Sequence, residues 1–263
     1  MAEISATPAA VEPKITLHWL DRSRSQRIVW LLEECKGMTY DIKLYKRGAD
    51  MLAPASLKEI HPLGKSPVIS VEAPALAKPL VIAESGTLSD YLTDYFAKDL
   101  VPARYLPGKE GQVGGETEQF LRYRYYMHYA EGSLMTLMML KLFTNSIKSG
   151  PDVPFFAKPI TKIIGGRVES AFLNRNFKTQ FDFLESQLAT APDGGKFICG
   201  KDLTAADIMM SFPLIAGKSY ITKSEYPKLA AYVEMLESQP GYVRSVKKIE
   251  NLSGEKFEAA FDR

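Results

Sequence analysis

The sequence predicts a mixed α/β domain followed by an all-α domain. In residues 14–98, segments with strand character alternate with helical ones in the order β-α-β and then β-β-α, which is typical of a compact mixed sheet with helices. Residues 99–115 contain four glycines and two prolines, a composition that predicts a linker. From residue 116 to 248 the apolar residues recur at helical spacing, and no strand pattern of useful length interrupts them.

The first domain begins with an alternation of strand and helix. Residues 15–20 are mostly β-branched, aromatic or apolar and predict a short buried strand. Residues 25–36 carry apolar side chains at helical spacing, and Gly37 stands where a helix C-cap is expected. In residues 39–46 polar and apolar side chains alternate, which predicts a half-buried strand.

The rest of this domain predicts a hairpin and a helix. Residues 51–62 form a polar loop that is broken by proline. Two apolar segments, 68–71 and 79–83, flank a turn and predict an antiparallel hairpin. Residues 84–86 then lead into a helix over 87–96.

The second domain is expected to consist of helices. The predicted helices cover residues 116–143, 160–189, 204–218 and 228–238. A loop over 151–159 separates the first two. Thr204 and Asp207 form a capping box at the start of the third helix, and we expect a structural role for Asp207.

The ends of the chain fall outside both domains. Residues 1–13 lack the basic and apolar regions of a secretory signal, so we expect a disordered arm there. Residues 249–263 form a tail to which the pattern assigns no structure. The most apolar stretch, 134–143, is too short to cross a bilayer and contains Lys141, so we expect no membrane span.

The composition is that of an ordinary soluble protein. Of the 263 residues 46% are hydrophobic, and the net charge is only +2, which argues against a protein that binds nucleic acid through its phosphates. Cys35 and Cys199 are the only cysteines and form no CxxC pair, which argues against a disulfide framework and a structural zinc site. We therefore expect a protein of the cytoplasm, a reducing compartment.

The segment from His61 to Val68 (HPLGKSPV) combines a turn with the start of a strand. Pro67 fits poorly inside a ladder of strands, so it belongs where the strand begins. A cis bond between Ser66 and Pro67 would turn the chain sharply and leave the N–H and C=O groups of Val68 facing outward. Exposed backbone of this kind pairs with a peptide-like ligand by strand addition.

Polar groups near this segment suit the two ends of a small peptide. Glu84 supplies a carboxylate for an ammonium group, while Ser85 and the start of its helix supply hydroxyl and N–H donors for a carboxylate. A γ-glutamyl group carries both charges, and Lys65 offers a cation for a second carboxylate. Each residue also has a structural interpretation: Ser85 as a helix N-cap, Glu84 as a solvated acid and Lys65 as a surface residue.

The motifs resemble those of a known family. HPLGKSPV and AESG (83–86) are similar to the thioredoxin-like domain of glutathione transferases. The resemblance extends over residues 14–248 and indicates the type I (yeast-type) fungal glutathione transferases, through HWLDRSRSQR at 18–27, YKR at 45–47, YAEGS at 129–133 and LTAADIMMSFPL at 203–214. It implies a thioredoxin-like domain followed by the all-helical C-terminal domain of these enzymes.

The resemblance also implies a glutathione site. By this resemblance, the backbone of Val68 pairs with the cysteinyl unit of glutathione. Glu84 and Ser85 hold its γ-glutamyl end, and Lys65 with His61 lies near its glycyl carboxylate. The residues implied for glutathione binding are His61, Lys65, Ser66, Pro67, Val68, Glu84 and Ser85. Glutathione is then the cosubstrate, and no metal is implied.

Ser23 is the candidate catalytic residue. Aligned on Arg27, it falls where serine-type members of the family carry the hydroxyl that stabilises the glutathione thiolate. Its alternative role is that of a plain N-cap of the first helix. Other candidate donors near it are His18, Arg22, Arg24 and Ser25. Cys35 lies too late in the sequence for a catalytic thiol, and we expect it to be inert.

Soft apolar side chains suggest a site for the second substrate. Tyrosine and methionine residues crowd the first long helix of the second domain; such stripes suit varied apolar electrophiles but more often form a core or a dimer interface. The candidate electrophile-site residues are His18, Trp19, Arg24, Tyr126, Tyr129 and Met135. The resemblance further implies a homodimer, in which the first domain of one subunit pairs with the helical domain of the other.

The expected function is therefore conjugation of glutathione to apolar electrophiles, with reduction of organic hydroperoxides as a second activity, in detoxification. Two alternatives remain open. A glutathione-dependent thiol transferase is disfavoured because no cysteine stands at the catalytic position. A non-catalytic binding or regulatory protein would use the same fold without turnover.

Overall fold

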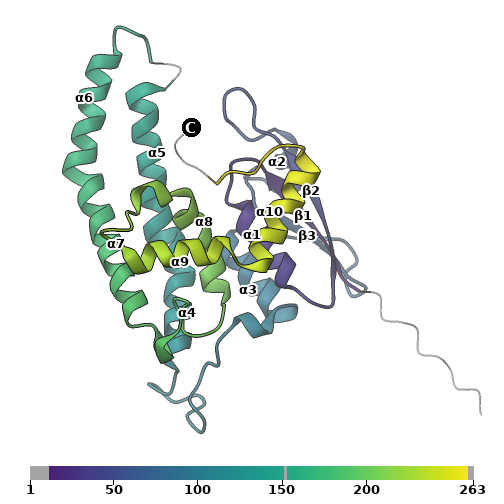
Figure 1. Cartoon of the computed structure of the whole chain (residues 1–263). Coiled ribbons are helices and arrows are strands. Elements are labelled where there is room, and N and C mark those ends of the chain that lie inside the picture. Colours follow the sequence, from purple (N-terminus) through teal and green to yellow (C-terminus); the bar gives the residue numbers. More distant parts are fainter. Residues whose placement is uncertain (1–11, 151–152, 260–263) are drawn as a thin grey trace, which may run out of the picture. The chain divides into compact units, whose positions relative to one another are not determined.

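In the computed structural model, which describes residues 12–150 and 153–259, the chain divides into two units after Ala97 (Figure 1). The first unit holds a four-stranded sheet with helices, and the second is built from helices. The prediction of an α/β domain followed by an all-α domain is confirmed. Most of the arm expected at 1–13, and the last four residues of the expected tail, lie outside the described residues.

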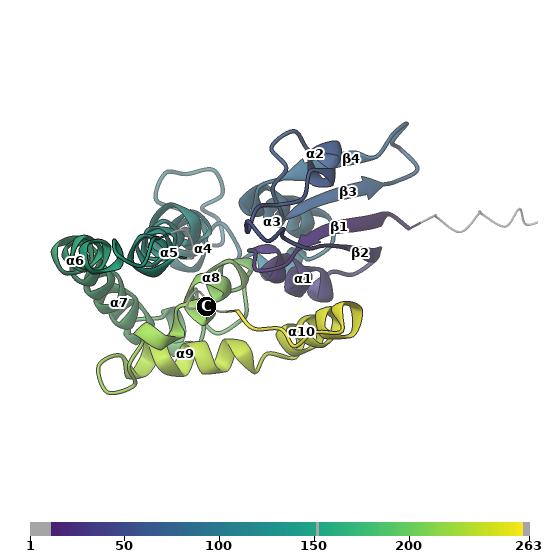
Figure 2. The ribbon, with the colours of Figure 1, turned by 90° about the horizontal axis from the view of Figure 1, so that it is seen from above.

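The sheet of the first unit has the strand order β2-β1-β3-β4 (Figure 2). Its strands are β1 (Lys14–Leu20), β2 (Thr39–Tyr45), β3 (Val68–Glu72) and β4 (Leu80–Ala83). β1 runs parallel to β2 and antiparallel to β3, and β3 is antiparallel to β4. The 68–71 and 79–83 segments therefore pair as the predicted hairpin, and both inner strands of the sheet end or begin beside the candidate site.

The sequence predicts two of the three helices in this unit. These are α1 (Ser25–Glu34) and α3 (Ser85–Tyr95), which pack against each other. The third, α2 (Ser56–Ile60), lies within the expected loop. It is too short to show a helical period, and Leu57 anchors it by packing with Leu20 and Tyr45.

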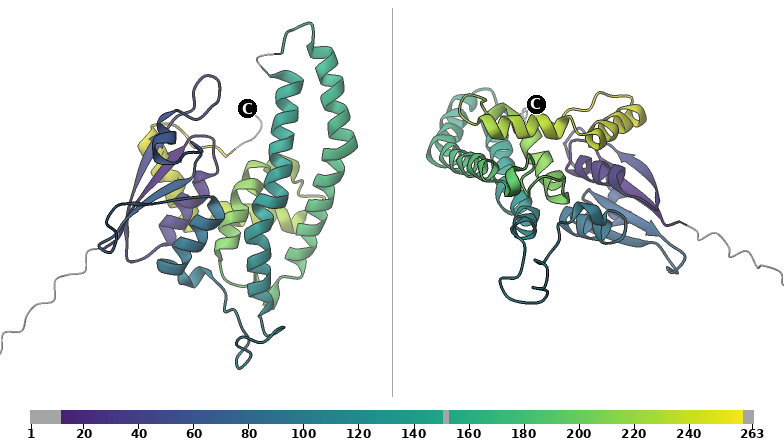
Figure 3. Two further views of the ribbon diagram at one scale, coloured as in Figure 1. Left: turned by 180° about the vertical axis from the view of Figure 1, so that it is seen from behind. Right: turned by 60° about the horizontal axis from the view of Figure 1, so that its bottom comes forward.

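Two long helices of the second unit each contain a π-helical segment. The first comprises α4 (Glu118–Tyr129), the π-helical residues Ala130–Met135 and α5 (Thr136–Ser149). The second comprises α6 (Lys158–Val168), the π-helical residues Glu169–Leu173 and α7 (Asn174–Ala189). Figure 3 shows α5 and α6 side by side. Lys141 and Lys148 of α5 both donate to the carboxylate of Glu169, at 2.5 and 2.7 Å, and so tie the two long helices together.

The remaining helices are α8 (Ala205–Ala216), α9 (Pro227–Glu237) and α10 (Pro240–Ser253). The sequence predicts α8 and α9 but not α10, which continues past the boundary expected at residue 248. Pro240 and Gly241 read as a chain break, yet proline is well suited to the first turn of a helix, where its missing N–H is not needed. None of the described helices is long and apolar enough to cross a bilayer.

The second unit also includes the residues expected as a linker. The segment forms a closed loop, because the N–H of Leu106 donates to the carbonyl of Gly115 and the N–H of Thr117 donates to that of Arg104. Lys98–Leu100 form a short 3-10 helix before this loop. The glycines and prolines therefore build an ordered turn rather than an extended connection.

Candidate functional site

The Ser66–Pro67 peptide bond is cis, and Val68 begins β3 directly after it. In the register of the sheet Val68 has His18 of β1 on one side and Ala83 of β4 on the other. Val68 therefore lies inside the ladder, and the expectation that its backbone faces outward is not met. The reason is topological: β3 is an inner strand, so a peptide can approach only the backbone that precedes it.

Ser66 provides that backbone. Within the described residues, neither its N–H nor its C=O group forms a hydrogen bond with another backbone group. Its hydroxyl, by contrast, donates to the carbonyl oxygen of His18 at 2.6 Å. The side chain is thus anchored on β1 while the backbone is open to a ligand.

Glu84 and Ser85 stand at the N-terminus of α3, directly after Ala83. Glu84 occupies the N-cap position, with φ of 72° and ψ of 123°, and its side chain is exposed and makes no cap hydrogen bond. Ser85 is the first helical residue, so the interpretation of Ser85 as the N-cap is wrong. Its side chain is buried, yet its hydroxyl makes no hydrogen bond within the described residues. A positive φ is unfavourable for a residue with a Cβ, which makes the placement of Glu84 a feature that the surrounding structure imposes.

Lys65 and His61 lie in the turn before the cis peptide bond. Lys65 is exposed and forms no ion pair with a described residue. His61 ends α2; its carbonyl accepts from the N–H of Gly64 at 2.8 Å, and its Nδ1 is 3.4 Å from the N–H of Leu63. His61 therefore shapes the turn, and Lys65 is an exposed cation in the same turn.

Three serine hydroxyls connect the loop after β1 with the loop before β3. Ser23 donates to the carbonyl oxygen of Leu20 at 2.7 Å, and Ser66 donates to that of His18. Ser25 Oγ lies between them, 2.7 Å from Ser23 Oγ and 2.5 Å from Ser66 Oγ. The sequence suggests Ser25 only as one more donor, because the spacing Ser-X-Ser does not reveal a contact with a loop 41 residues away.

Ser23 is not the N-cap of α1. The helix begins at Ser25, and Arg24 occupies the cap position without a side-chain cap hydrogen bond. The Oγ of Ser23 instead accepts from the N–H of Ser25 at 3.2 Å. Ser25 is buried, whereas Ser23 and Ser66 remain partly exposed. Of the two serine hydroxyls after β1, that of Ser23 is therefore the more accessible to a ligand. The hydrogen bond from the first N–H of α1 fixes its position.

His18 and Trp19 are both buried in β1, and their side chains point to opposite faces of the sheet. The ring nitrogens of His18 are 3.0 Å from the Tyr45 hydroxyl and 3.0 Å from Ser70 Oγ. Burial, with a smaller effect from Lys43, lowers the pKa of His18. His18 is therefore committed to the interior of the first unit, while the indole N–H of Trp19 has no hydrogen-bond partner among the described residues.

The other candidate electrophile-site residues belong to the core of the second unit. Tyr126 and Tyr129 of α4 and Met135 of the following π-helical segment are all buried. The phenol of Tyr126 donates to Gln187 at 3.4 Å and that of Tyr129 donates to Gln180, both on α7. Burial raises the pKa of both tyrosines. These phenols connect α4 to α7, which agrees with the alternative interpretation of the stripe as core.

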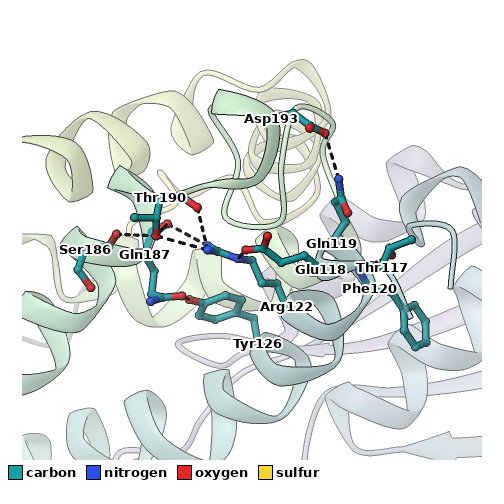
Figure 4. Close-up of polar contacts among 10 residues, drawn as sticks. All are labelled: Thr117, Glu118, Gln119, Phe120, Arg122, Tyr126, Ser186, Gln187, Thr190 and Asp193. Atoms are coloured by element: carbon teal, nitrogen blue, oxygen red, sulfur yellow. Dashed lines mark hydrogen bonds and ion pairs between the residues drawn. The ribbon is translucent and has the colours of Figure 1, made fainter. Parts of the chain in front are cut away.

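A second connection between the same helices was not apparent in the sequence. Figure 4 shows Arg122 of α4 reaching the C-terminus of α7. Its guanidinium donates to the carbonyl oxygens of Gln187 at 3.0 Å and Thr190 at 2.8 Å, and to the carboxylate of Glu118 at 2.9 Å. A cation satisfies the unpaired carbonyls of a helix end and interacts favourably with its dipole, so Arg122 is a structural residue.

Asp207 has the structural role that its capping box predicts. It is completely buried at the start of α8 and accepts hydrogen bonds from the N–H of Ile198, from the N–H and hydroxyl of Thr204, and from the phenol of Tyr232. Burial raises the pKa of its carboxyl, and these hydrogen bonds oppose the shift. The Asp207 network joins the loop before α8 to α9.

Neither cysteine has the surroundings of a nucleophile. The Cys35 thiol contacts the carbonyl oxygen of Leu31, and burial, with a smaller effect from Glu34, raises its pKa to about 12. Burial likewise raises the pKa of Cys199. In the part of the chain that the structure describes, no cluster of histidine, cysteine, aspartate or glutamate side chains could hold a metal ion.

Two protein-family models match the sequence. The model of the glutathione S-transferase N-terminal domain matches residues 13–94, and that of the glutathione S-transferase C-terminal domain matches residues 165–244. The chain is 32% identical over 238 residues to Glutathione S-transferase 1 of Saccharomyces cerevisiae, which covers 90% of this chain and 95% of that protein. It is 27% identical to Glutathione S-transferase 3 of Schizosaccharomyces pombe, over 90% of this chain and 88% of that protein.

Solved structures of similar proteins agree with these matches. A glutathione S-transferase from Actinobacillus pleuropneumoniae is 30% identical, with a TM-score of 0.61 over 89% of this chain and 92% of the other. A glutathione transferase homolog from Lodderomyces elongisporus, solved with two GSH per subunit, is 17% identical, with a TM-score of 0.61 over 88% of this chain and 97% of the other. At that lower identity the similarity concerns the fold alone.

Proposed function

Because the chain belongs to the glutathione S-transferase family, we propose that it joins the thiolate of glutathione to small apolar electrophiles and reduces organic hydroperoxides. Membership follows from the matches of both family models and from the 32% identity to the yeast enzyme. It also identifies the first unit as thioredoxin-like and the second as the helical domain of these transferases. The proposed role is detoxification in the cytoplasm.

One geometric observation carries the proposal: open polar groups meet where β3 begins and β4 ends. Val68 and Ala83 are partners in register, so Ser66 precedes one strand and Glu84 follows the other at the same end of the hairpin. We assign the backbone of Ser66, rather than that of Val68, to the cysteinyl unit of glutathione. The Ser85 hydroxyl and the first N–H groups of α3 bind the γ-glutamyl carboxylate, and Glu84 binds its ammonium group.

The remaining end of glutathione requires a cation. Lys65 is exposed in the turn that leads to Ser66, and it is the group that we assign to the glycyl carboxylate. His61 supports this assignment by holding the turn through its carbonyl oxygen. Pro67 contributes by its cis bond, which turns the chain from this loop into β3.

Ser23 is the residue that we assign to thiol activation. A free thiol has a pKa of about 8.5, so only a few per cent is thiolate at neutral pH. A hydroxyl donor stabilises the charged form, and the N-terminus of α1, two residues after Ser23, adds a favourable dipole. The thiolate then forms a bond to carbon as the leaving group departs with its electron pair. With a hydroperoxide it attacks the terminal oxygen and displaces alkoxide, which takes up the proton that the first thiol released. The resulting sulfenic acid then reacts with the thiol of a second glutathione to give the disulfide and water.

Apolar side chains on the second unit support a homodimer. Met139 and Phe143 on α5, Ile164 on α6 and Phe172 in the π-helical segment between α6 and α7 are 45–62% exposed. Exposed apolar surface of this kind is used in many proteins for protein–protein contact. A second copy of the chain is the partner that family membership favours.

Capture on immobilised glutathione, followed by assays with a chloro-aromatic electrophile and an organic hydroperoxide, tests the proposal. We expect binding and turnover of both substrates. Binding without turnover would identify the non-catalytic alternative, and turnover of a glutathione mixed disulfide alone would identify a thiol transferase. A matched control is the Ser85→Ala variant, which should be captured less well while remaining folded.

A further inference from the structure

Three serine hydroxyls at the candidate site make four short contacts with only three protons. Carbonyl oxygens can only accept, so the contacts of Ser23 with Leu20 and of Ser66 with His18 use the protons of Ser23 and Ser66. The proton of Ser25 remains for two contacts, 2.7 Å to Ser23 Oγ and 2.5 Å to Ser66 Oγ. One of these two contacts therefore brings oxygen lone pairs together with no proton between them.

A different orientation of the same hydroxyls moves the contact that lacks a proton out of the serine cluster, to Ser66 and the carbonyl oxygen of His18. When Ser66 donates to Ser25, and Ser25 donates to Ser23, each contact among the three serines holds one proton. Ser23 is then free to donate its own proton to an acceptor other than the Leu20 carbonyl. An anionic acceptor favours this orientation, because hydrogen bonds to a charged atom are about twice as strong as neutral ones.

We propose that Ser66, Ser25 and Ser23 form one chain of hydrogen bonds that ends on the sulfur of bound glutathione. In this chain Ser25 is a positioning residue, which acts on the sulfur through Ser23. The inference rests on the proposed function of Ser23. It adds that binding of the glutathione backbone is coupled to stabilisation of its thiolate. Ser66, whose backbone pairs with glutathione, also supplies the first hydroxyl donor of the chain.

The surroundings of Ser25 suit this role. Its side chain is completely buried, so its hydroxyl interacts with Ser23 and Ser66 rather than with solvent. Its backbone N–H also donates to Ser23 Oγ at 3.2 Å. Ser23 can thus accept two hydrogen bonds from one residue, and a hydroxyl that accepts hydrogen bonds becomes a stronger donor.

The test measures the pKa of the thiol in bound glutathione, from the ultraviolet absorbance of the thiolate against pH. In Ser25→Ala we expect this pKa to rise by about half a unit to one unit, and turnover at neutral pH to fall about three- to tenfold. Turnover should recover as the pH is raised. Ser211→Ala is the matched control, because Ser211 is also buried and donates only to a helix carbonyl, that of Ile208 at 2.7 Å. It should leave the thiol pKa unchanged.

A double variant separates action through Ser23 from direct action. We expect Ser23→Ala/Ser25→Ala to have the thiol pKa of Ser23→Ala alone. If Ser25→Ala does not fold, Ser66→Ala interrupts the chain at its other end and should raise the thiol pKa only in the presence of Ser23.

Two results would overturn the chain, and they are distinct. If Ser23→Ala raises the thiol pKa while Ser25→Ala and Ser66→Ala do not, the role of Ser23 stands and the chain is wrong. If Ser23→Ala leaves the thiol pKa unchanged, the proposed role of Ser23 fails. Any effect of Ser25→Ala in that case would mean direct contact with the sulfur.

Discussion

The phenol of Tyr232 donates a hydrogen bond to the carboxylate of Asp207 at 2.7 Å, and both side chains are buried. The same carboxylate oxygen also accepts from the N–H of Ile198, while the other oxygen accepts both donors of Thr204. Every partner of Asp207 is thus a donor, and the site accommodates a carboxylate better than any uncharged side chain.

Asp207→Asn should therefore destabilise the protein strongly. The NH2 group of the introduced asparagine is itself a donor, and it would face either the two donors of Thr204 or those of Ile198 and Tyr232. We therefore expect a loss of about 2–4 kcal/mol in the free energy of unfolding. Tyr232→Phe removes a single donor and should cost about 1–2 kcal/mol. Denaturant unfolding measures both. Tyr226→Phe is the control, because the Tyr226 hydroxyl donates one long hydrogen bond, to Glu225 at 3.3 Å, and the ring that packs on Phe181 is kept. Equal stability of Asp207→Asn and the parent would contradict this role.

The ion pairs of Glu169 predict a pH-dependent contribution to stability. Hydrogen bonds from Lys141 and then Lys148 lower the pKa of the Glu169 carboxyl. A lowered pKa means that the contribution is present above the pKa of the unfolded chain and is lost as the pH falls through the folded value. Glu169→Gln should thus cost about 1 kcal/mol near neutral pH and less in acid. Thermal unfolding over a pH series checks this, and a cost that stays constant into acid would show a role in packing only.

Ser85→Ala should weaken glutathione binding about tenfold, through loss of roughly 1–2 kcal/mol of hydrogen bonding. Ser89→Ala is the control in the same helix, because the Ser89 hydroxyl donates to the Ser85 carbonyl at 2.8 Å and is not open to a ligand. Calorimetry on folded variants measures both. Unchanged affinity in Ser85→Ala would refute its assignment to the γ-glutamyl group.

Ser23→Ala should lower turnover near neutral pH about ten- to a hundredfold, because a charge-assisted hydrogen bond is worth roughly 1.5–3 kcal/mol. Glutathione affinity should change little, since the ends of the peptide are held by other residues. A rise in the thiol pKa and partial recovery at high pH would accompany the loss. A loss of thermal stability with an unmoved thiol titration would instead indicate that Ser23 only supports the start of α1.

Light scattering at micromolar concentration should give about twice the chain mass of 29.3 kDa. Phe143→Glu places a charge on the exposed apolar group of α5 and should shift the protein to the monomer. Lys178→Glu, an exposed change on α7, is the control. A monomeric parent protein would exclude the dimer.

Regular elements could be predicted because their patterns repeat. The strands 15–20 and 68–71 and the long helix from 116 carry enough apolar positions to define a period. α2 and α10 could not be predicted in this way. The first depends on one buried residue, Leu57, and the second begins with a proline that also suits a chain break.

The candidate site was predictable only as a set of residues. The sequence predicts a hairpin in which Pro67 precedes one strand and Glu84 follows the other. The two residues therefore lie at the same end of the hairpin. The sequence does not show that Val68 lies between two strands, because strand order depends on pairing between distant segments. The link between Ser25 and Ser66 is of the same kind, since it needs both loops to be in place.

The π-helical segments give each long helix of the second unit a shift in phase. One residue of an α-helix corresponds to a rotation of about 100°, so an inserted residue turns every side chain that follows it to a new direction. Through the segment at Ala130–Met135, α4 can face α8 while α5 faces α6, although one continuous backbone joins them. Removing a single residue there would leave an unbroken helix but point Met139 and Phe143 elsewhere. The direction in which Met139 and Phe143 point thus depends on the number of residues in the π-helical segment before them, Ala130–Met135, which has six.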